Sequence, residues 1–356
     1  MITKLALKNF RCFQNFTLDG IRPVTLIAGT NNVGKSTLLE GLFLFIDRNS
    51  SDVFLKLNGF RGIRSISLSP KVVWEPLFTN MDVNNTIEIS IENNNNEMQT
   101  VAASKDSTFS LSTIADIPLP TNIQGAKSPV LNSYPLKLCY SDSENYDISH
   151  FTLTEIGITL TPRKPINTIT PYTHYLSSSL IIQSQLVAEW FGKIELEGKK
   201  SQCVKILQKL DSRVKDLSVI IIGGLSGIYA DLRLASMLSV NMLGDGVNKL
   251  LHIALVMLAN PGAVILIDEI ENGFHYSFYP KLWEIIGELA TITSCQVFAT
   301  TQSYECISGA AALAADITNP ELFRFIRLDC NDEGITPKVF DNDSFEYAIK
   351  NEWEIR

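Results

Sequence analysis

The chain has 356 residues, of which 45% are hydrophobic and 19% are charged, with 20 glycines and 14 prolines. This composition excludes collagen-like, low-complexity and wholly disordered proteins, and the length allows two domains or one large domain with an insertion. The formal net charge of −8 argues against a surface that is basic all over, as a general nucleic-acid binder would need.

Basic residues are nevertheless concentrated near the N-terminus. Residues 1–64 contain nine Lys or Arg and four Asp or Glu, whereas residues 301–356 contain five and eleven. A site for an anionic ligand is therefore expected in the N-terminal part.

The cysteines and the apolar stretches indicate the cellular location to expect. The six cysteines form no C-x-x-C pair and no histidine stands at zinc spacing, so we expect reduced thiols, a cytoplasmic location and no metal cluster. The N-terminus carries a charge every few residues, unlike a signal peptide. The longest uncharged apolar stretch, residues 250–267, is interrupted by Asn260-Pro261-Gly262, so we expect no membrane span.

The first 48 residues predict two strands and a helix. Polar and apolar side chains alternate from Lys4 to Phe10, and residues 24–28 form an apolar run that ends at Gly29. Both patterns are typical of strands. A helix is expected from Lys35 to about Asp47.

The amino-acid composition and pattern change twice in the middle of the chain. Residues 49–176 are rich in Asn, Ser, Thr and Pro and predict a β-rich, loop-rich subdomain, with a hairpin tip at residues 93–96. Residues 177–216 have apolar side chains at helical spacing and predict two helices, broken near Gly198, that form a helical arm. Seven basic against four acidic residues between 193 and 216 fit a solvated helical face best, with a nucleic-acid or partner surface as the alternative.

Residues 217–356 alternate between strand and helix patterns, which predicts a parallel sheet with helices packed on it. The expected strands are 219–222, 263–267 and 296–300, and the expected helices are 247–259 and 279–290.

The clearest motif runs from Gly29 to Ser36 and matches the complete phosphate-loop pattern G-x-x-x-x-G-K-S/T between a predicted strand and a predicted helix. Glycines let the backbone N–H groups point at phosphate oxygens, and the helix adds the positive end of its dipole. Lys35 would reach the β- and γ-phosphates of ATP, and Ser36 would place its hydroxyl on Mg²⁺. The residues expected to bind nucleotide here are Gly29, Asn31, Asn32, Val33, Gly34, Lys35, Ser36 and Thr37.

Two further motifs complete a nucleotide site. The apolar run 264–267 ends in Asp268 and Glu269, so Asp268 can hold the same Mg²⁺ as Ser36, and Glu269 can orient or deprotonate the attacking water. Residues 243–249 place Gly244, Asp245 and Gly246 directly before an apolar helix, which predicts a second phosphate-binding loop. An ordinary capped helix start is the alternative for this loop.

Together these motifs resemble the ABC-class ATPases of the OLD (overcoming lysogenization defect) group, in the AAA-family branch that lacks a nuclease domain. The resemblance implies that Arg11 lies near the nucleotide, that residues 243–249 are a signature loop contacting the γ-phosphate held by the opposite subunit, and that residues 268–277 form the Walker B motif and D-loop. The family's Toprim nuclease domain would not fit into the roughly 55 residues after Thr301, so any nuclease is expected on another polypeptide.

The chain departs from this family at two positions. Relatives commonly place a histidine that senses the γ-phosphate where this chain has Gln302, and because an amide cannot become cationic we expect slow hydrolysis, with Glu269 and Gln302 as the catalytic residues. The Q-loop glutamine of the family has no clear counterpart, and Gln183 and Gln185 are its candidates.

The sequence thus predicts an α/β protein, a P-loop NTPase of the ABC-ATPase type with a β-rich subdomain and a helical arm. The ATPase domain is expected in residues 1–48 and 217–356, with the subdomain in 49–176 and the arm in 177–216. The expected assembly is a homodimer or higher homo-oligomer around ATP and Mg²⁺. The resemblance implies a sensor or regulatory subunit of bacterial anti-phage defence that controls a separately encoded effector such as a nuclease.

Two alternatives remain open at this stage. One is a DNA repair or recombination ATPase akin to the SMC-like clamps, which is weakened because no long heptad segment is present for a coiled-coil arm. The other is a non-hydrolysing scaffold that ATP holds together. Nucleic acid stays an open partner, and a membrane is not expected.

Overall fold

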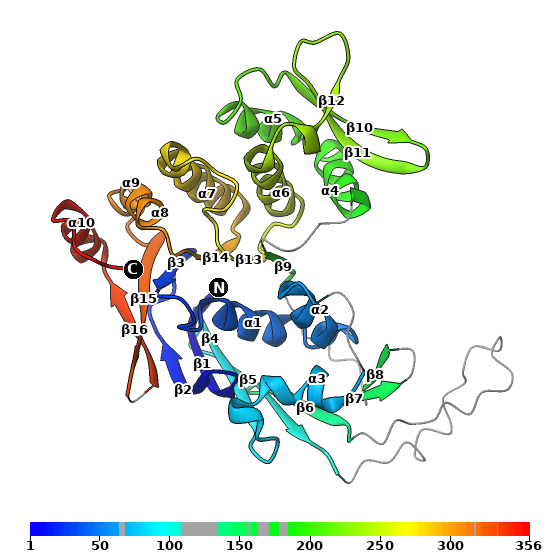
Figure 1. Cartoon of the computed structure of the whole chain (residues 1–356), viewed down its shortest axis with the longest axis vertical. Helices are drawn as coiled ribbons and strands as arrows, with labels where there is room; N and C mark the ends of the chain where they lie inside the picture. The colour runs from blue at the N-terminus through cyan, green and yellow to red at the C-terminus, as the bar shows by residue number, and fades with distance from the viewer. Residues whose placement is uncertain are drawn as a thin grey trace, which may run out of the picture.

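The structure is a computed structural model, and it describes residues 1–63, 68–107, 134–154, 157–162, 171–177, 184–316, 318–332 and 334–356. This part of the chain forms a six-stranded sheet, a seven-stranded sheet and a three-stranded sheet, with helices between and around them (Figure 1). Among the helices in these ranges, none combines the length and the apolarity needed to cross a bilayer.

The six-stranded sheet is the centre of the molecule. Its strands, in spatial order, are β16 (Gly334–Phe340), β15 (Phe323–Asn331), β3 (Val24–Gly29), β14 (Gln296–Thr300), β13 (Val264–Ile267) and β9 (Thr173–Leu176). All neighbours are parallel except β16, which is antiparallel to β15. The prediction of a parallel sheet is confirmed for β13 and β14, and the predicted strand β3 joins the same sheet. The continuous apolar runs of all three are typical of parallel strands buried on both faces.

The seven-stranded sheet is antiparallel throughout. Its order is β2 (Phe13–Leu18), β1 (Ile2–Phe10), β4 (Ile87–Asn93), β5 (Met98–Lys105), β6 (Leu136–Ser141), β7 (Tyr146–Thr154) and β8 (Gly157–Pro162). The predicted hairpin tip at residues 93–96 joins β4 to β5, and Asn96 has the positive φ of 59° that a tight turn requires. The N-terminal strand β1 therefore belongs to this sheet and not to the parallel one.

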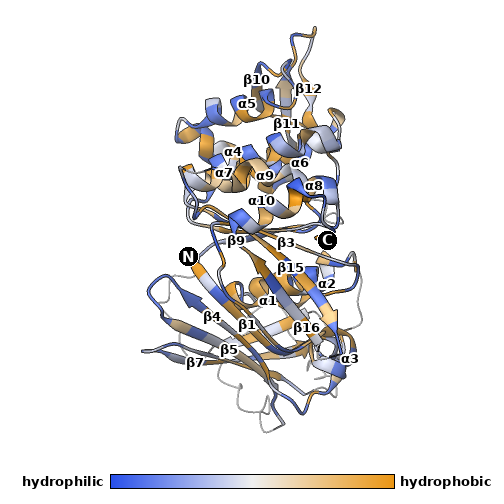
Figure 2. Cartoon of the chain, turned by 90° about the vertical axis from the view of Figure 1, so that its left-hand side faces the viewer, coloured by the Kyte–Doolittle hydropathy of each residue, from blue (hydrophilic) through white to orange (hydrophobic). Residues whose placement is uncertain are grey.

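Helix α1 (Lys35–Ile46) lies between the two large sheets, and Figure 2 shows the layers in sequence as helices, central sheet, α1 and antiparallel sheet. Ten of its twelve residues are buried, which explains its nearly continuous apolar sequence. Gly41 allows close approach to the antiparallel sheet, since a Cβ there would lie 2.9 Å from Leu7 Cδ2. The helix that begins at the phosphate loop is thus held firmly on both sides.

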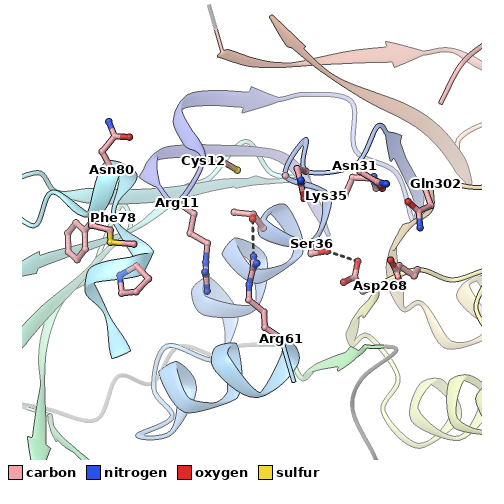
Figure 3. Close-up of a pocket in the computed structure, with 16 residues that line it drawn as sticks. Arg11, Cys12, Asn31, Lys35, Ser36, Arg61, Phe78, Asn80, Asp268 and Gln302 are labelled. Atoms are coloured by element: carbon pink, nitrogen blue, oxygen red, sulfur yellow. Dashed lines mark hydrogen bonds between the residues drawn. The ribbon is translucent and has the colours of Figure 1, made fainter. Parts of the chain in front are cut away.

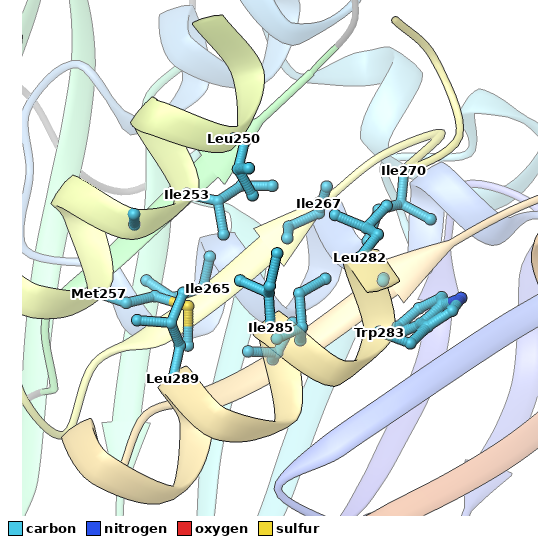
Figure 4. Packing of buried hydrophobic residues seen from close by; sticks show 14 of the residues in the cluster. Leu250, Ile253, Met257, Ile265, Ile267, Ile270, Leu282, Trp283, Ile285 and Leu289 are labelled. Carbon is cyan, nitrogen blue, oxygen red and sulfur yellow. The ribbon is translucent and has the colours of Figure 1, made fainter. Parts of the chain in front are cut away.

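The opposite face of the central sheet is covered by α6 (Asp245–Ala259) and α7 (Tyr279–Thr293), with α8 (Tyr304–Gly309), α9 (Ala311–Ala314) and α10 (Asn342–Lys350) beside them. Figure 4 shows Ile265 and Ile267 of β13 packed against Leu250 of α6 and Ile285 of α7. Leu266, the residue between them, belongs to the core on the α1 side. Alternate side chains of one strand therefore stabilise two separate cores, at about 1.5–3 kcal/mol for each fully buried large apolar side chain.

The helical arm consists of α4 (Ser184–Leu196) and α5 (Lys200–Gln208), and the predicted break falls at Gly198, which has a φ of +71°. Packed on it is an antiparallel sheet of β10 (Asp216–Ile222), β11 (Leu225–Asp231) and β12 (Leu238–Ser239). The prediction that residues 219–222 join the parallel sheet is wrong. Gly223 and Gly224 have φ values of +60° and +81°, so they form a tight hairpin turn that pairs this strand with the next one along the chain.

Two segments pack with elements outside the groups of residues in which they were expected. Residues 216–239 pack with the arm, whereas β9, expected in the β-rich subdomain, is an edge strand of the central sheet. The remaining elements are short, namely α2 (Val53–Phe60), α3 (Pro70–Val73), and the 3₁₀ turns Glu75–Leu77, Thr79–Met81, Val240–Met242 and Tyr276–Phe278.

Candidate nucleotide-binding site

A cavity of about 650 Å³ opens where the carboxyl ends of the parallel strands meet the N-terminus of α1 (Figure 3). Its volume falls in the range of small-molecule sites, about 300–1,000 Å³. Its walls are residues 11–12, 31–32, 34–37, 61, 76, 78, 80–81, 268–269 and 302. The cavity therefore brings residues 11–81 together with residues 268–302, which are far apart in the sequence.

The phosphate loop forms one wall, and its backbone explains its sequence. Gly29 has a φ of +144°, and a Cβ there would lie 2.7 Å from Leu328 O and 2.7 Å from Val33 Cγ1. Gly34 has a φ of +95°, and a Cβ would lie 2.9 Å from Phe13 Cζ. In the described part of the chain no side chain caps α1 at Gly34, so the positive end of the helix dipole faces the cavity.

Lys35, the first residue of α1, folds back over this loop. Its Nζ donates hydrogen bonds to Gly29 O at 2.6 Å and to Thr30 O at 2.9 Å. Burial lowers the pKa of Lys35, and the carboxylates of Asp268, Glu271 and Glu269 oppose that shift. An anion held in the curve of the loop would meet an ammonium group fixed beside it. Gly29 and Val33 support this loop from behind and are not among the cavity walls.

Ser36 and Asp268 approach each other across the gap between α1 and β13. Ser36 Oγ donates to Asp268 Oδ1 at 3.0 Å, and Thr300 Oγ1 donates to the same oxygen at 2.5 Å. Tyr175 OH donates to Oδ2 at 3.2 Å, and burial, followed by the charges of Asp268 and Glu40, raises the Tyr175 pKa far enough to keep it a donor. Hydroxyl and carboxylate oxygens are the ligands that Mg²⁺ prefers, so this donor set fits the ion.

Glu269 follows directly and has a backbone conformation that is rare for its residue type. Its φ is +48°, its N–H donates to Thr300 Oγ1 at 2.9 Å, and Asn272 Nδ2 donates to its Oε2 at 2.7 Å. Strained non-glycine residues of this kind are concentrated at functional sites, where the surrounding contacts impose the conformation. The turn places the Glu269 side chain at the cavity wall, next to Asp268.

Arg11 and Arg61 line the side of the cavity nearest α1 and share one buried carboxylate. Arg11 Nε lies 2.9 Å from Glu40 Oε2, and Arg61 Nε donates to Glu40 Oε1 at 2.7 Å. Arg61 also donates to Thr37 Oγ1 at 3.2 Å. Burial lowers the pKa of Arg11, whereas the Glu40 hydrogen bond raises that of Arg61. Two cations against one anion leave this wall positive, which suits a phosphate chain.

Gln302 completes the cavity from the end of β14. Its backbone N–H donates to Glu271 Oε1 at 3.0 Å. Its exposed side chain lines the cavity together with Asp268 (Figure 3), and Glu269 belongs to the same lining. Gln302 lies beside these carboxylates because β13 and β14 are parallel neighbours, and neighbouring parallel strands end at the same edge of a sheet.

The loop Gly244-Asp245-Gly246 does not line this cavity as far as the structure describes it. It begins α6, and a Cβ on Gly244 would meet nothing within 4 Å. For the Q-loop, Gln183 lies outside the described residues, and Gln185 sits exposed on α4 with its Nε2 3.4 Å from Glu189 Oε1.

Sequence reasoning did not find Arg61, Glu40, Tyr175 and Thr300, although one of them left a signal. Glu40 interrupts the apolar run of α1 from Leu38 to Ile46, and a charge on a helix that is otherwise buried needs a cationic partner. The identity of that partner was not readable, because Arg11 and Arg61 come from separate elements.

Residues 24–308 match the family model AAA_21, described as "AAA domain, putative AbiEii toxin, Type IV TA system". A Helicobacter pylori protein named ATP/GTP phosphatase is 25% identical over 377 aligned positions, which cover 99% of both chains. The SMC head bound to the C-winged helix domain of ScpA has a TM-score of 0.50 at 13% identity, with 98% of this chain and 99% of that chain covered. The SMC head of Thermotoga maritima has a TM-score of 0.48 at 12% identity, covering 95% and 98%. The likeness to the first head confirms the expected α/β P-loop ATPase fold.

Proposed function

The chain belongs to the AAA_21 family of AAA domains, and on that premise we propose that it binds ATP with Mg²⁺ in the cavity described above and hydrolyses it. The observation that carries the proposal is the convergence of Lys35, the Ser36–Asp268 pair and Glu269 on one cavity. These groups are the parts that phosphoryl transfer needs, namely a charged cradle, an ion site and a group that acts on water. The name of the Helicobacter pylori relative supports hydrolysis.

Each group of residues in the cavity has its own role in the proposed reaction. The backbone of residues 31–37 and Lys35 hold the phosphates, and Arg11 adds positive charge to the wall beside them. Ser36 and Asp268 would hold Mg²⁺, and the ion would supply positive charge to compensate the phosphates. Glu269 orients the attacking water and accepts its proton, while Gln302 donates a neutral hydrogen bond to the γ-phosphate. Because a neutral donor stabilises developing charge less than a cationic one, the basal rate is slow.

The proposed assembly is a head-to-tail dimer in which Gly244, Asp245 and Gly246 contact the nucleotide of the neighbouring subunit. Support comes from the position of this loop, which is accessible, begins a helix and lies outside the cavity of its own chain. A helix N-terminus offers unpaired N–H groups to an anion, so a second chain can complete the phosphate contacts.

In the cell we propose a sensor or regulatory role in the OLD group of anti-phage ATPases, acting on a separately encoded effector such as a nuclease. The family description, which refers to a toxin–antitoxin system, supports work with a second protein. A nucleic-acid surface on the arm has less support, because Lys200 pairs with Asp216 at 3.0 Å and Lys209 with Glu288 at 2.5 Å. Repair or recombination is the rival role, which the SMC-like fold alone does not favour.

Two substitutions separate binding from hydrolysis. Lys35→Ala is expected to abolish tight ATP binding, because it removes the charge that compensates the phosphates. Glu269→Gln is expected to keep binding, to lower the catalytic rate by about 10²–10⁴-fold, the usual contribution of a general base, and to accumulate an ATP-bound dimer. Isothermal titration, phosphate release and size-exclusion chromatography measure the three effects. The matched control is Lys281→Ala, at a half-exposed lysine on α7 that is not among the cavity walls.

The same assays address the scaffold alternative. If the parent protein dimerises with ATP and Mg²⁺ but releases no phosphate, the chain is an ATP-gated scaffold. If Glu269→Gln hydrolyses ATP at the parent rate, the role given to Glu269 is wrong. Removal of Mg²⁺ by a chelator should stop hydrolysis in the parent protein and leave its fold intact, as measured by circular dichroism.

A further inference from the structure

Lys249, in the first turns of α6, ties this helix to the segment that follows Asp268. Its Nζ donates hydrogen bonds to Glu269 O at 2.8 Å, to Ile270 O at 3.1 Å and to Asn272 O at 3.2 Å. A single ammonium group therefore binds three carbonyls within one turn of chain, and charged donors make the stronger class of hydrogen bond. Lys249 is the last residue of the expected signature loop 243–249, and the proposed reaction gives its side chain no role.

The loop in front of Lys249 packs against the same segment. A Cβ on Gly246 would lie 2.7 Å from Gly273 O, and a Cβ on Gly273 would lie 3.3 Å from Asp245 Cβ. Lys249 Nζ also lies 6.0 Å from the centroid of the Phe274 ring. The loop 244–246 and residues 269–274 thus form one packed unit, which the half-buried Lys249 joins through its hydrogen bonds.

Lys249 is connected to Glu269 through two sets of hydrogen bonds. Lys249 holds the carbonyl of Glu269 itself, where the backbone has a φ of +48°. It also holds the carbonyl of Asn272, whose side chain donates to Glu269 Oε2 at 2.7 Å. A shift of the loop is therefore transmitted both to the main chain and to the carboxylate of Glu269. Packed interiors transmit such shifts because they have few voids to absorb them.

We propose that Lys249 is a positioning residue that couples the two nucleotide sites of the dimer. When the loop 244–246 of one subunit contacts the nucleotide of its neighbour, Lys249 sets Glu269 of its own subunit in the hydrolytic position. The inference rests on the proposed function, because it requires that Glu269 acts on water and that the loop works across the interface. It adds a means by which occupation of one site controls hydrolysis in the other.

The charges around Lys249 fit this role. Burial lowers the pKa of Lys249 to about 8, against the opposing effects of Glu271, Cys306, Glu269 and Asp268, so the group is largely protonated at neutral pH. Substitution by methionine keeps the length and the apolar stem and removes every donor. Substitution by arginine keeps cationic donors on a longer side chain.

The test measures ATP hydrolysis against ATP concentration for the full-length parent protein, Lys249→Met, Lys249→Arg and the control Lys281→Met. For a two-site dimer we expect the parent to have a Hill coefficient between about 1 and 2. Lys249→Met should lower kcat by at least about tenfold, the scale of loss when a positioned catalytic group is displaced, and should bring the Hill coefficient to about 1. ATP affinity, measured by titration, should change by less than twofold. Lys249→Arg should recover part of both losses.

The outcomes separate this inference from the proposed function. If the parent hydrolyses ATP without cooperativity, or if Lys249→Met folds as the parent does in thermal melts and keeps its kcat, the coupling is wrong while the ATPase remains. If Lys249→Arg is no better than Lys249→Met, the hydrogen bonds are not the cause and the inference also fails. Absence of hydrolysis in the parent would instead overturn the proposed function.

Discussion

At the scale of single residues, Gln302 carries the sharpest chemical question. Its side chain enters the cavity beside Asp268 and Glu269, and its backbone is fixed by the hydrogen bond from Gln302 N to Glu271 Oε1. The position of the side chain is therefore set by the strand end and by a neighbouring carboxylate, independently of the amide group. A different side chain at residue 302 would be presented to the same place.

Gln302→His is accordingly expected to raise the catalytic rate with little change in ATP affinity. An imidazolium can form a charge-assisted hydrogen bond, roughly twice as strong as a neutral one, and the gain applies mostly to the transition state, where charge develops. Single-turnover hydrolysis on the purified variant measures the effect, with Gln302→Asn as a neutral control. A rate equal to or below that of the parent would show that Gln302 does not limit turnover.

At the scale of elements, the junction of β9, α4 and α6 buries two histidines that do not take part in the site. His174 of β9 meets the ring of Trp190 of α4 edge-on, with centroids 4.8 Å apart. Burial lowers the pKa of His174 to about 4, helped by the charge of His252 on α6, and burial alone lowers that of His252 to about 4. Both histidines are neutral in the folded protein at neutral pH.

These shifts predict acid sensitivity with a defined sign. An unfolded histidine titrates near pH 6.5, so between about pH 6.5 and 4 the unfolded chain binds more protons and the free energy of unfolding falls as the pH falls. Each histidine accounts for about 2 kcal/mol after a discount for its partial exposure, and neither affects stability above pH 6.5. Urea titrations at pH 7.5, 6 and 5 measure the slope. His174→Phe, which keeps the ring contact with Trp190, should reduce it; an unchanged slope would assign the effect to other groups.

At the scale of the whole molecule, the proposed dimer requires each chain to supply two separate parts of a nucleotide site, the cavity and the loop 244–246. The walls of the cavity include Lys35, Asp268 and Glu269 but, among the described residues, not the loop at Gly244. A dimer with two-fold symmetry would join each cavity to the loop of the other chain, which is the usual closure for such self-complementary surfaces. Defects in the cavity and in the loop should therefore complement each other.

Mixing Lys35→Ala with Gly244→Gln tests this arrangement. Each variant alone should be inactive, while mixed dimers should contain one intact composite site and regain part of the hydrolysis. Gly244→Ala is the matched control, since it has the same strain at a φ of +104° without the bulk. Gly244→Gln should still bind ATP as a monomer. No recovery on mixing, in a preparation shown to exchange subunits, would count against contact in trans.

The sequence by itself determined the parts of this protein that depend on neighbours in the chain. Gly29 and Gly34 need positive φ values, α1 follows them at once, and the apolar strand ending at Asp268 has its own signature, so the phosphate loop and the carboxylates could be read from spacing alone. The two helices of the arm and the hairpin tip at residues 93–96 were equally local.

Only the tertiary structure decided which distant residues meet. Thr300 and Tyr175 bind Asp268 because β14, β13 and β9 lie side by side, and no sequence pattern records that order. The partners of Glu40 and the three carbonyls at Lys249 are likewise set by the packing of helices on the two faces of one sheet. Local pattern fixes the backbone of each segment, but contacts between segments depend on how both cores close, and that information is distributed over the whole chain.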